Sequence, residues 1–387
     1  MVFTLNKMKN NNNRRDFLGK FLLGITSALA LPFIGSARSK EETMNNSHSD
    51  NPIIRVKPLG FQWETADPFL FCVHHEDHYP NGNDEMGPDQ SLDGRHIGQD
   101  FILKDGYRMY HGATIPGFPG HPHRGFETIT VVRKGMVDHA DSQGAAGRYG
   151  NGDVQWMTAG KGLQHSEMFP LINKDADNPL ELFQIWLNLP KKNKMVEPHF
   201  KMLWNHTIPL LEHTDAQSKT TTIEVIAGIL NNTNAPSPPP DSWASEQENH
   251  VGVFNIQINP GAHYTLPASS EGINRTVYFY QGDELELSGT KIPEYHGVEV
   301  HANVAIELKN NGASVVKLLV LQGQPINEPV VQHGPFVMNT REEIQEAFDD
   351  YHRTQFGGWP WPQQGPVHDR SKGRFALHAD GTEENQS

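Results

Sequence analysis

The chain has 387 residues and a formal net charge of −14 at pH 7, from 32 Lys and Arg against 46 Asp and Glu. This acidic balance argues against nucleic-acid binding through a basic face, so no nucleic-acid partner is expected. Cys72 is the single cysteine, which excludes an internal disulfide. The many short β-rich runs, together with 27 Pro and 35 Gly, favour an all-β fold over an α/β fold.

The N-terminus resembles a twin-arginine export signal. Arg14 and Arg15 lie in the run Asn-Arg-Arg-Asp-Phe-Leu-Gly-Lys, and residues 21–35 form an apolar stretch after it. That stretch is shorter than the roughly 20 residues that a membrane span needs. We therefore expect a signal peptide at residues 1–37, cleaved after Ala37; Ala28 and Ala30 mark a second candidate site.

Export by the twin-arginine machinery is the expected consequence of this signal. It predicts a periplasmic or secreted protein with no stable membrane span after cleavage. An uncleaved N-terminal membrane anchor is the alternative.

Two domains are predicted after a polar, flexible spacer at residues 38–51. They are expected at residues 52–228 and 229–345, with a proline-containing loop at 231–250 between their strands. The predicted strands lie at 69–73, 128–132, 153–157, 180–189 and 222–226 in the first domain, and at 251–258, 276–280, 284–287, 305–308 and 315–321 in the second.

A short helix is predicted at residues 340–356, because Thr340 and Glu343 form a capping-box signature before an apolar stripe at helical spacing. Residues 346–387 are expected to hold the end of this helix and a polar, mobile tail.

Two short motifs carry the functional signal: His121-Pro122-His123 and His165-Ser166-Glu167. Side chains two residues apart in a strand point to the same face, so each motif can direct both polar side chains into one cavity. Three imidazoles and a carboxylate are a typical ligand set for a divalent first-row metal, and they leave coordination positions open for a substrate. The second domain has His263 but neither motif, so it is expected to lack metal.

The carboxylate ligand is open at this point. Glu127 follows the His-x-His pair by four residues, as in many cupins, and strand alternation alone would permit it as a ligand. Glu167 in the second motif is the other candidate.

The residues around both motifs closely resemble the pirins, a branch of the cupin superfamily. The resemblance runs from about residue 52 to 350 and includes the segments at 116–128, 152–167, 180–189 and 332–340. It implies two cupin-type (jelly-roll) β-barrel domains in tandem, with one metal ion, expected to be iron, held by His121, His123, His165 and Glu167. Ligand type alone would also allow Mn, Ni, Co, Cu or Zn. Glu127 then becomes a supporting or structural residue.

The resemblance also implies an activity of the quercetin 2,3-dioxygenase type, with O2 and a small flavonol-like or other enolisable aromatic compound as substrates. Glu167 could also accept the substrate proton. Candidate walls of the substrate pocket are Phe118, Phe126, Trp156, Met157 and Trp186. The alternative function is a non-enzymatic, metal-dependent redox-sensing or binding protein of the periplasm, because a cupin fold does not fix a reaction.

Residues between Val73 and Tyr110 form a segment that typical pirins lack or hold in shorter form. It is rich in histidine, including His74, His75 and His78. Each of these histidines is expected to lie in a solvated loop; the alternative is that some reach over the metal pocket and shape substrate choice.

Overall fold

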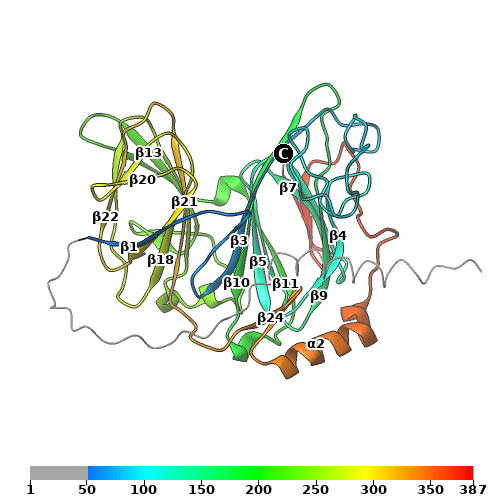
Figure 1. The fold of residues 1–387 in the computed structure, drawn as a ribbon. Helices are drawn as coiled ribbons and strands as arrows, with labels where there is room; N and C mark the ends of the chain where they lie inside the picture. The colour runs from blue at the N-terminus through cyan, green and yellow to red at the C-terminus, as the bar shows by residue number, and fades with distance from the viewer. Residues whose placement is uncertain (1–50, 387) are drawn as a thin grey trace, which may run out of the picture.

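A computed structural model describes residues 51–386. The predicted signal peptide at 1–37, and all of the predicted spacer except residue 51, lie outside the described residues. The all-β expectation is confirmed: two domains, each built from two packed sheets, lie side by side (Figure 1). Every strand run predicted from the sequence overlaps a strand of the structure. Within residues 51–386, no helix is long and apolar enough to cross a membrane.

The N-terminal domain contains two six-stranded sheets. The first has the order β11-β8-β5-β10-β3-β2, with β2 (Gln62–Trp63), β3 (Phe69–Tyr79), β5 (Phe126–Lys134), β8 (Val154–Thr158), β10 (Asn178–Asn188) and β11 (His199–Leu203). The second has the order β27-β26-β7-β6-β9-β4, with β4 (Gly117–His123), β6 (Met136–Asp141), β7 (Ala146–Gly150), β9 (Leu163–Met168), β26 (Arg374–Leu377) and β27 (Glu383–Gln386).

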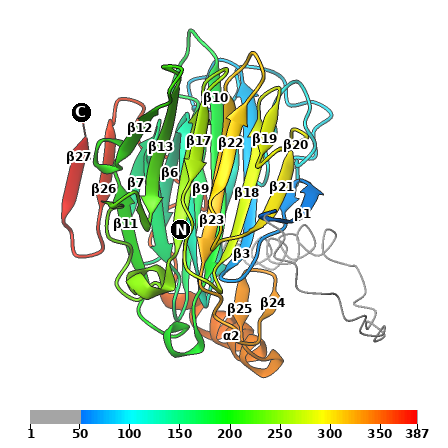
Figure 2. The same cartoon turned by 90° about the vertical axis from the view of Figure 1, so that its left-hand side faces the viewer.

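The C-terminal domain packs a seven-stranded sheet on a four-stranded sheet. The larger sheet has the order β1-β21-β18-β23-β16-β13-β12, and Figure 2 shows β1 and β12 at its two edges. Its strands are β1 (Ile53–Pro58), β12 (Leu210–Thr214), β13 (Thr220–Ala227), β16 (Gly252–Ile258), β18 (Asn274–Gln281), β21 (His296–His301) and β23 (Val316–Gly323). The smaller sheet, β17-β22-β19-β20, contains β17 (His263–Leu266), β19 (Leu285–Leu287), β20 (Thr290–Ile292) and β22 (Ile306–Asn310).

Both ends of the described chain cross to the other domain. Strand β1, expected to begin the first domain, pairs with β21 of the second domain's sheet. Strands β12 and β13, placed in the first domain by the predicted boundary at residue 228, also belong to that sheet. At the other end, β26 pairs with β7 of the N-terminal domain (Figure 2). The prediction of a mobile polar tail is therefore wrong for residues 374–386, which form strands.

Two large apolar clusters fill the interiors of the domains, and a third joins the domains to each other. One fills the C-terminal domain around Phe254 and Phe279, and one fills much of the N-terminal domain around Tyr110 and Tyr149. The third joins the domains, because it contains Trp156 from β8 together with Tyr278 and Leu319 from the other domain. Burial of apolar surface on this scale is the main force that holds the domains in contact.

The predicted helix is confirmed as α2 (Arg341–Thr354), with both hydrogen bonds of the Thr340–Glu343 capping box formed. It lies beneath the N-terminal domain (Figure 1), beside the short hairpin of β24 (Val331–His333) and β25 (Phe336–Met338). The remaining elements are the hairpin of β14 (Ile229–Leu230) and β15 (Thr233–Asn234) and short 3-10 turns at Lys191–Asn193, Asn205–Thr207, Trp243–Ser245, Gln247–Asn249 and Gln355–Gly357.

The histidine-rich segment is partly a strand. Strand β3 runs on to Tyr79, so His74, His75 and His78 lie in the six-stranded sheet rather than in a solvated loop. His75 is buried, whereas His78 is exposed. The residues between β3 and β4 form loops at the end of the N-terminal domain that is remote from α2 (Figure 1).

Candidate metal centre

The two predicted motifs meet across one pair of strands. Strands β4 and β9 are antiparallel neighbours, and their register places His121 directly opposite His165. His123 points to the same face of β4 as His121, as strand alternation requires. The ligand nitrogens of His121, His123 and His165 all lie within 4.8 Å of one another, and all three side chains are buried.

These three imidazoles fit a metal ion. The Nδ1 of His121 lies 3.0 Å from the Pro119 carbonyl and that of His123 lies 3.4 Å from the Pro335 carbonyl. Because a carbonyl can only accept, each Nδ1 carries the proton and each Nε2 carries the lone pair that a metal needs. Among residues 51–386, neither ring nitrogen of the fully buried His165 has a hydrogen-bond partner. Such an orphaned group is costly unless something binds it.

Burial also keeps the cluster in the form that binds a metal. It lowers the pKa of His121 to about 4 and lowers the pKa values of His123 and His165 well below the usual range, with the neighbouring imidazoles acting in the same direction. Neutral imidazoles are therefore the stable form at neutral pH.

Glu167 borders the cluster. Its Oε2 lies 3.9 Å from Nε2 of His165 and accepts a hydrogen bond from Nε2 of Gln184 at 2.7 Å. Its Oε1 accepts a hydrogen bond from Oγ1 of Thr130 at 2.9 Å. Burial raises the pKa of this carboxyl, and these hydrogen bonds oppose the rise. The assignment of Glu167 as fourth ligand stays a prediction, because the tightly grouped ligand atoms belong to the three histidines.

Glu127 lies away from the cluster. Its carboxylate accepts hydrogen bonds from Thr158 Oγ1 at 2.7 Å and from Ser242 Oγ at 2.5 Å, and Ser242 belongs to the loop between β15 and β16 of the C-terminal domain. The strand alternation that would have permitted Glu127 as a ligand is broken, because Arg124 and Gly125 separate β4 from β5 and Gly125 has a φ of 86°. Glu127 is therefore a structural residue of the domain interface, not a support of the histidines.

Three of the five predicted wall residues lie beside the histidines, and the other two pack elsewhere. The rings of Phe126 and Trp186 lie 5.0 and 5.5 Å from that of His123, and the ring of Phe118 lies 6.4 Å from that of His121. Trp156 instead packs in the apolar cluster between the domains, and Met157 packs with Ala159 and Leu163. Trp156 and Met157 are adjacent in a strand, so they could never have lined the same pocket.

Sequence reasoning missed three residues beside the cluster: Thr130, Gln184 and His139. Thr130 and Gln184 interrupt apolar strands with polar side chains at interior positions, which was a readable signal. The ring of His139 lies 5.6 Å from that of His165 and stacks on Phe200. Nothing in its sequence context, Asp138-His139-Ala140-Asp141, distinguished it from a solvated residue.

The end of α2 and the chain that follows it support β4 and β9, the two strands that carry the histidines. The side chain of Gln164 donates hydrogen bonds to the carbonyls of Gln355 and Gly358, and accepts one from the hydroxyl of Tyr351. The backbone N–H of Gly120 donates to the carbonyl of Gln364 at 2.6 Å. These bonds fix the residues immediately beside His121 and His165.

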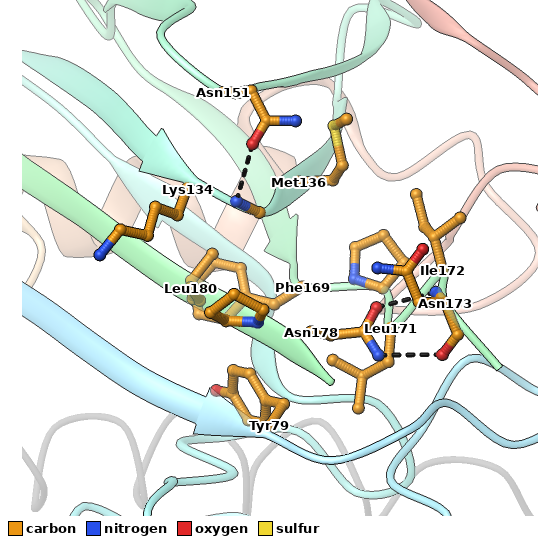
Figure 3. Close-up of a pocket in the computed structure, with 13 residues that line it drawn as sticks. Tyr79, Lys134, Met136, Asn151, Phe169, Leu171, Ile172, Asn173, Asn178 and Leu180 are labelled. Carbon is orange, nitrogen blue, oxygen red and sulfur yellow. Dashed lines mark hydrogen bonds between the residues drawn. The ribbon is translucent and has the colours of Figure 1, made fainter. Parts of the chain in front are cut away.

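A separate cavity of about 340 Å³ opens at the opposite end of the same barrel (Figure 3). It lies at the ends of β5 and β10 that are remote from the histidines, around Lys134, Phe169 and Leu180. The side chain of Asn151 accepts a hydrogen bond from the Gly135 backbone, and the side chain of Asn178 forms hydrogen bonds with the Asn173 backbone. Both side chains therefore stabilise the local loop backbone. The cavity contains no predicted ligand residue.

Comparison with known proteins gives consistent matches. Residues 55–187 match the Pirin family and residues 253–357 match the Pirin C-terminal cupin domain. A pirin-like protein of Solanum lycopersicum is 32% identical over 65% of this chain and 79% of its own length. A Pseudomonas aeruginosa protein provisionally named a quercetin 2,3-dioxygenase is 35% identical over 62% of this chain and 79% of its own length. Among solved structures, quercetin 2,3-dioxygenase from Acinetobacter baumannii is similar with a TM-score of 0.62 and 26% identity, over 79% of this chain and 98% of that chain.

Proposed function

Because the chain belongs to the pirin family, we propose that it is a metal-dependent dioxygenase of the quercetin 2,3-dioxygenase type. Its substrates would be O2 and a flavonol-like or other enolisable aromatic compound. The observation that carries this proposal is the buried cluster of His121, His123 and His165, with Glu167 at its edge. The similarity to the Acinetobacter enzyme and to the provisionally named Pseudomonas protein supports the reaction type.

His121, His123, His165 and Glu167 would hold one divalent ion, with iron proposed from the family and Mn, Ni, Co, Cu or Zn compatible with the donor set. When bound, such an ion supplies Lewis acidity toward an enolate or phenolate oxygen and open coordination positions. The protein itself supplies the site's shape and its proton acceptor.

In this proposal, Glu167 takes the proton of the substrate hydroxyl. Burial raises the pKa of its carboxyl, which makes the group a better base than an exposed glutamate. Thr130 and Gln184 each donate to one of its oxygens and so hold the carboxylate in a fixed orientation. Phe126 and Trp186, whose rings lie 4.2 Å apart, give an apolar wall beside His123 that excludes water from the reacting atoms.

The twin-arginine motif supports a further part of the proposal, namely that this chemistry takes place in the periplasm or outside the cell after export. The interaction with the export machinery and the removal of the signal belong to the same proposal. Both rest on the sequence of residues 1–37.

Oxygen uptake with a panel of flavonols tests the activity. Metal-loaded protein should consume O2 only when a flavonol is added. Glu167→Gln should reduce kcat by about a hundredfold or more, the usual contribution of a positioned general base. His206→Gln, which changes an exposed histidine of the same domain, should leave the rate unchanged. Full metal content without any turnover would favour a metal-dependent redox-sensing or binding protein instead.

A further inference from the structure

A row of aromatic rings leads from the protein surface to the histidine cluster. Phe61 is 44% exposed, and its ring lies 6.0 Å from that of His75. The ring of His75 lies 6.0 Å from that of the half-buried Phe118, which in turn borders His121. Tyr110 and Phe101 flank the same rings from the loops between β3 and β4. Solvent-reachable aromatic rings beside a candidate metal centre are a natural path for a flat aromatic ligand.

His75 has a defined polar role within this row. Its Nδ1 lies 2.8 Å from the hydroxyl of Tyr110, and that hydroxyl donates a 2.6 Å hydrogen bond to Oδ2 of Asp77. Oδ1 of Asp77 accepts from the backbone N–H of Arg108 at 2.8 Å and from its guanidinium at 3.1 Å. The single proton of the Tyr110 hydroxyl is therefore committed to Asp77, and Nδ1 of His75 must be the donor to Tyr110.

This arrangement fixes the tautomer of His75. With the proton on Nδ1, Nε2 carries a bare lone pair that can only accept a hydrogen bond. Burial, with the charge of Arg108, lowers the pKa of His75 to about 3, so the ring stays neutral. In the part of the chain that the structure describes, no protein group forms a hydrogen bond with Nε2, and this atom is not among the fully buried polar atoms without a partner, so it reaches solvent although the residue is only 5% exposed. An acceptor that reaches solvent beside this row of aromatic rings is available to a donor group on a ligand.

We propose that Nε2 of His75 accepts a hydrogen bond from a ring hydroxyl of the aromatic substrate, and that this contact selects polyhydroxylated aromatics. Tyr110, Asp77 and Arg108 are positioning residues, because they act only by holding the imidazole in the accepting tautomer. This inference rests on the proposed function, since it names the substrate class of the same site. It gives the histidine-rich segment a role in substrate recognition, because only the ring of Phe118 separates His75 from His121.

Two probes separate recognition from packing. Quercetin carries several ring hydroxyls, whereas 3-hydroxyflavone keeps the same enolisable 3-hydroxy-4-keto group without the others. Dissociation constants should be measured without O2 on metal-loaded protein, by quenching of tryptophan fluorescence, and KM and kcat should then be measured with O2.

His75→Phe keeps a ring of similar size but removes the acceptor. It should weaken quercetin binding about five- to tenfold, the effect of one lost hydrogen bond, and should change 3-hydroxyflavone binding less than about twofold. The effect in turnover should lie in KM rather than kcat. His75→Gln offers both a donor to Tyr110 and an acceptor, and should restore part of the preference for quercetin. His78→Phe, on the exposed side of the same strand, is the matched control and should bind both probes as the wild type does.

Tyr110→Phe provides a second variant in case His75→Phe does not fold. It leaves His75 in place but frees its tautomer, so the preference for quercetin should fall while 3-hydroxyflavone binding persists. Equal weakening of both probes in these variants, an unchanged preference, or a wild type that binds neither flavonol would overturn the inference. A wild type that prefers quercetin through His75 but consumes no O2 would uphold it and refute the proposed catalysis.

Discussion

Replacement of Glu127 by Gln tests whether this carboxyl is the buried interface residue that the structure shows. Burial raises the pKa of Glu127 from its usual 4.5 to about 7, although Ser242 and Thr158 oppose the rise by hydrogen bonding. The folded protein therefore holds this proton more tightly than the unfolded chain does. The stability that results is complete below pH 4.5 and is lost as the pH rises through about 7.

The size of the effect follows from the two pKa values. Between pH 5 and pH 8, ionisation of Glu127 should lower the free energy of unfolding by about 2 to 3 kcal/mol. Gln cannot ionise. Between pH 5 and pH 8, the free energy of unfolding of Glu127→Gln should therefore fall by about 2 to 3 kcal/mol less than that of the wild type. Urea unfolding of the metal-free wild type and of the variant at both pH values measures this difference. Subtracting the pH dependence of the variant from that of the wild type cancels the contribution of every other titrating group. Parallel pH dependences for the two proteins would show that Glu127 is not the desolvated residue described above.

Three further predictions concern the site, the fold and export. Glu127→Gln should leave metal content nearly intact, whereas Glu167→Gln should lower it or alter the electronic spectrum of the bound metal; the reverse pattern would make Glu127 the ligand. Arg148→Leu should destabilise the protein by about 3 to 5 kcal/mol in thermal or urea unfolding, because it leaves the buried carboxylate of Asp138 without its ion pair; a change under about 1 kcal/mol would contradict that reasoning. Joint replacement of Arg14 and Arg15 by Lys should retain the protein in the cytoplasm in a cell-fractionation assay, and normal export would refute the twin-arginine interpretation.

The histidine cluster could be predicted from the sequence because the pattern that indicates it lies within short stretches of the chain. His121 and His123 are two residues apart in a strand, and this spacing alone sets both rings on one face. The same rule failed at Glu127, since it holds only while the strand continues. Gly125, with its positive φ, ends one strand and lets the next begin with the opposite orientation. A turn of this kind cannot be read from alternation alone.

The exchange of strands between the domains could not be predicted, because it depends on pairings between residues far apart in the sequence. Nothing in residues 53–58 indicates that their partner is β21, about 240 residues later. The polar composition of the C-terminal segment pointed to a mobile tail. Its strand β26 instead covers the edge of β7, and the carbonyls of His368, Asp369 and Lys372 accept hydrogen bonds from the buried Arg148.

Metal analysis of the purified protein beside His165→Ala tests the central claim most directly. We expect about one divalent ion per chain in the wild type and in the His206→Gln control, because each chain contains one such cluster among its described residues. His165→Ala should lose most of that metal, because His165 lies opposite His121 and completes the cluster. Full metal retention in His165→Ala, or a wild type that binds no divalent ion when one is supplied, would contradict the account.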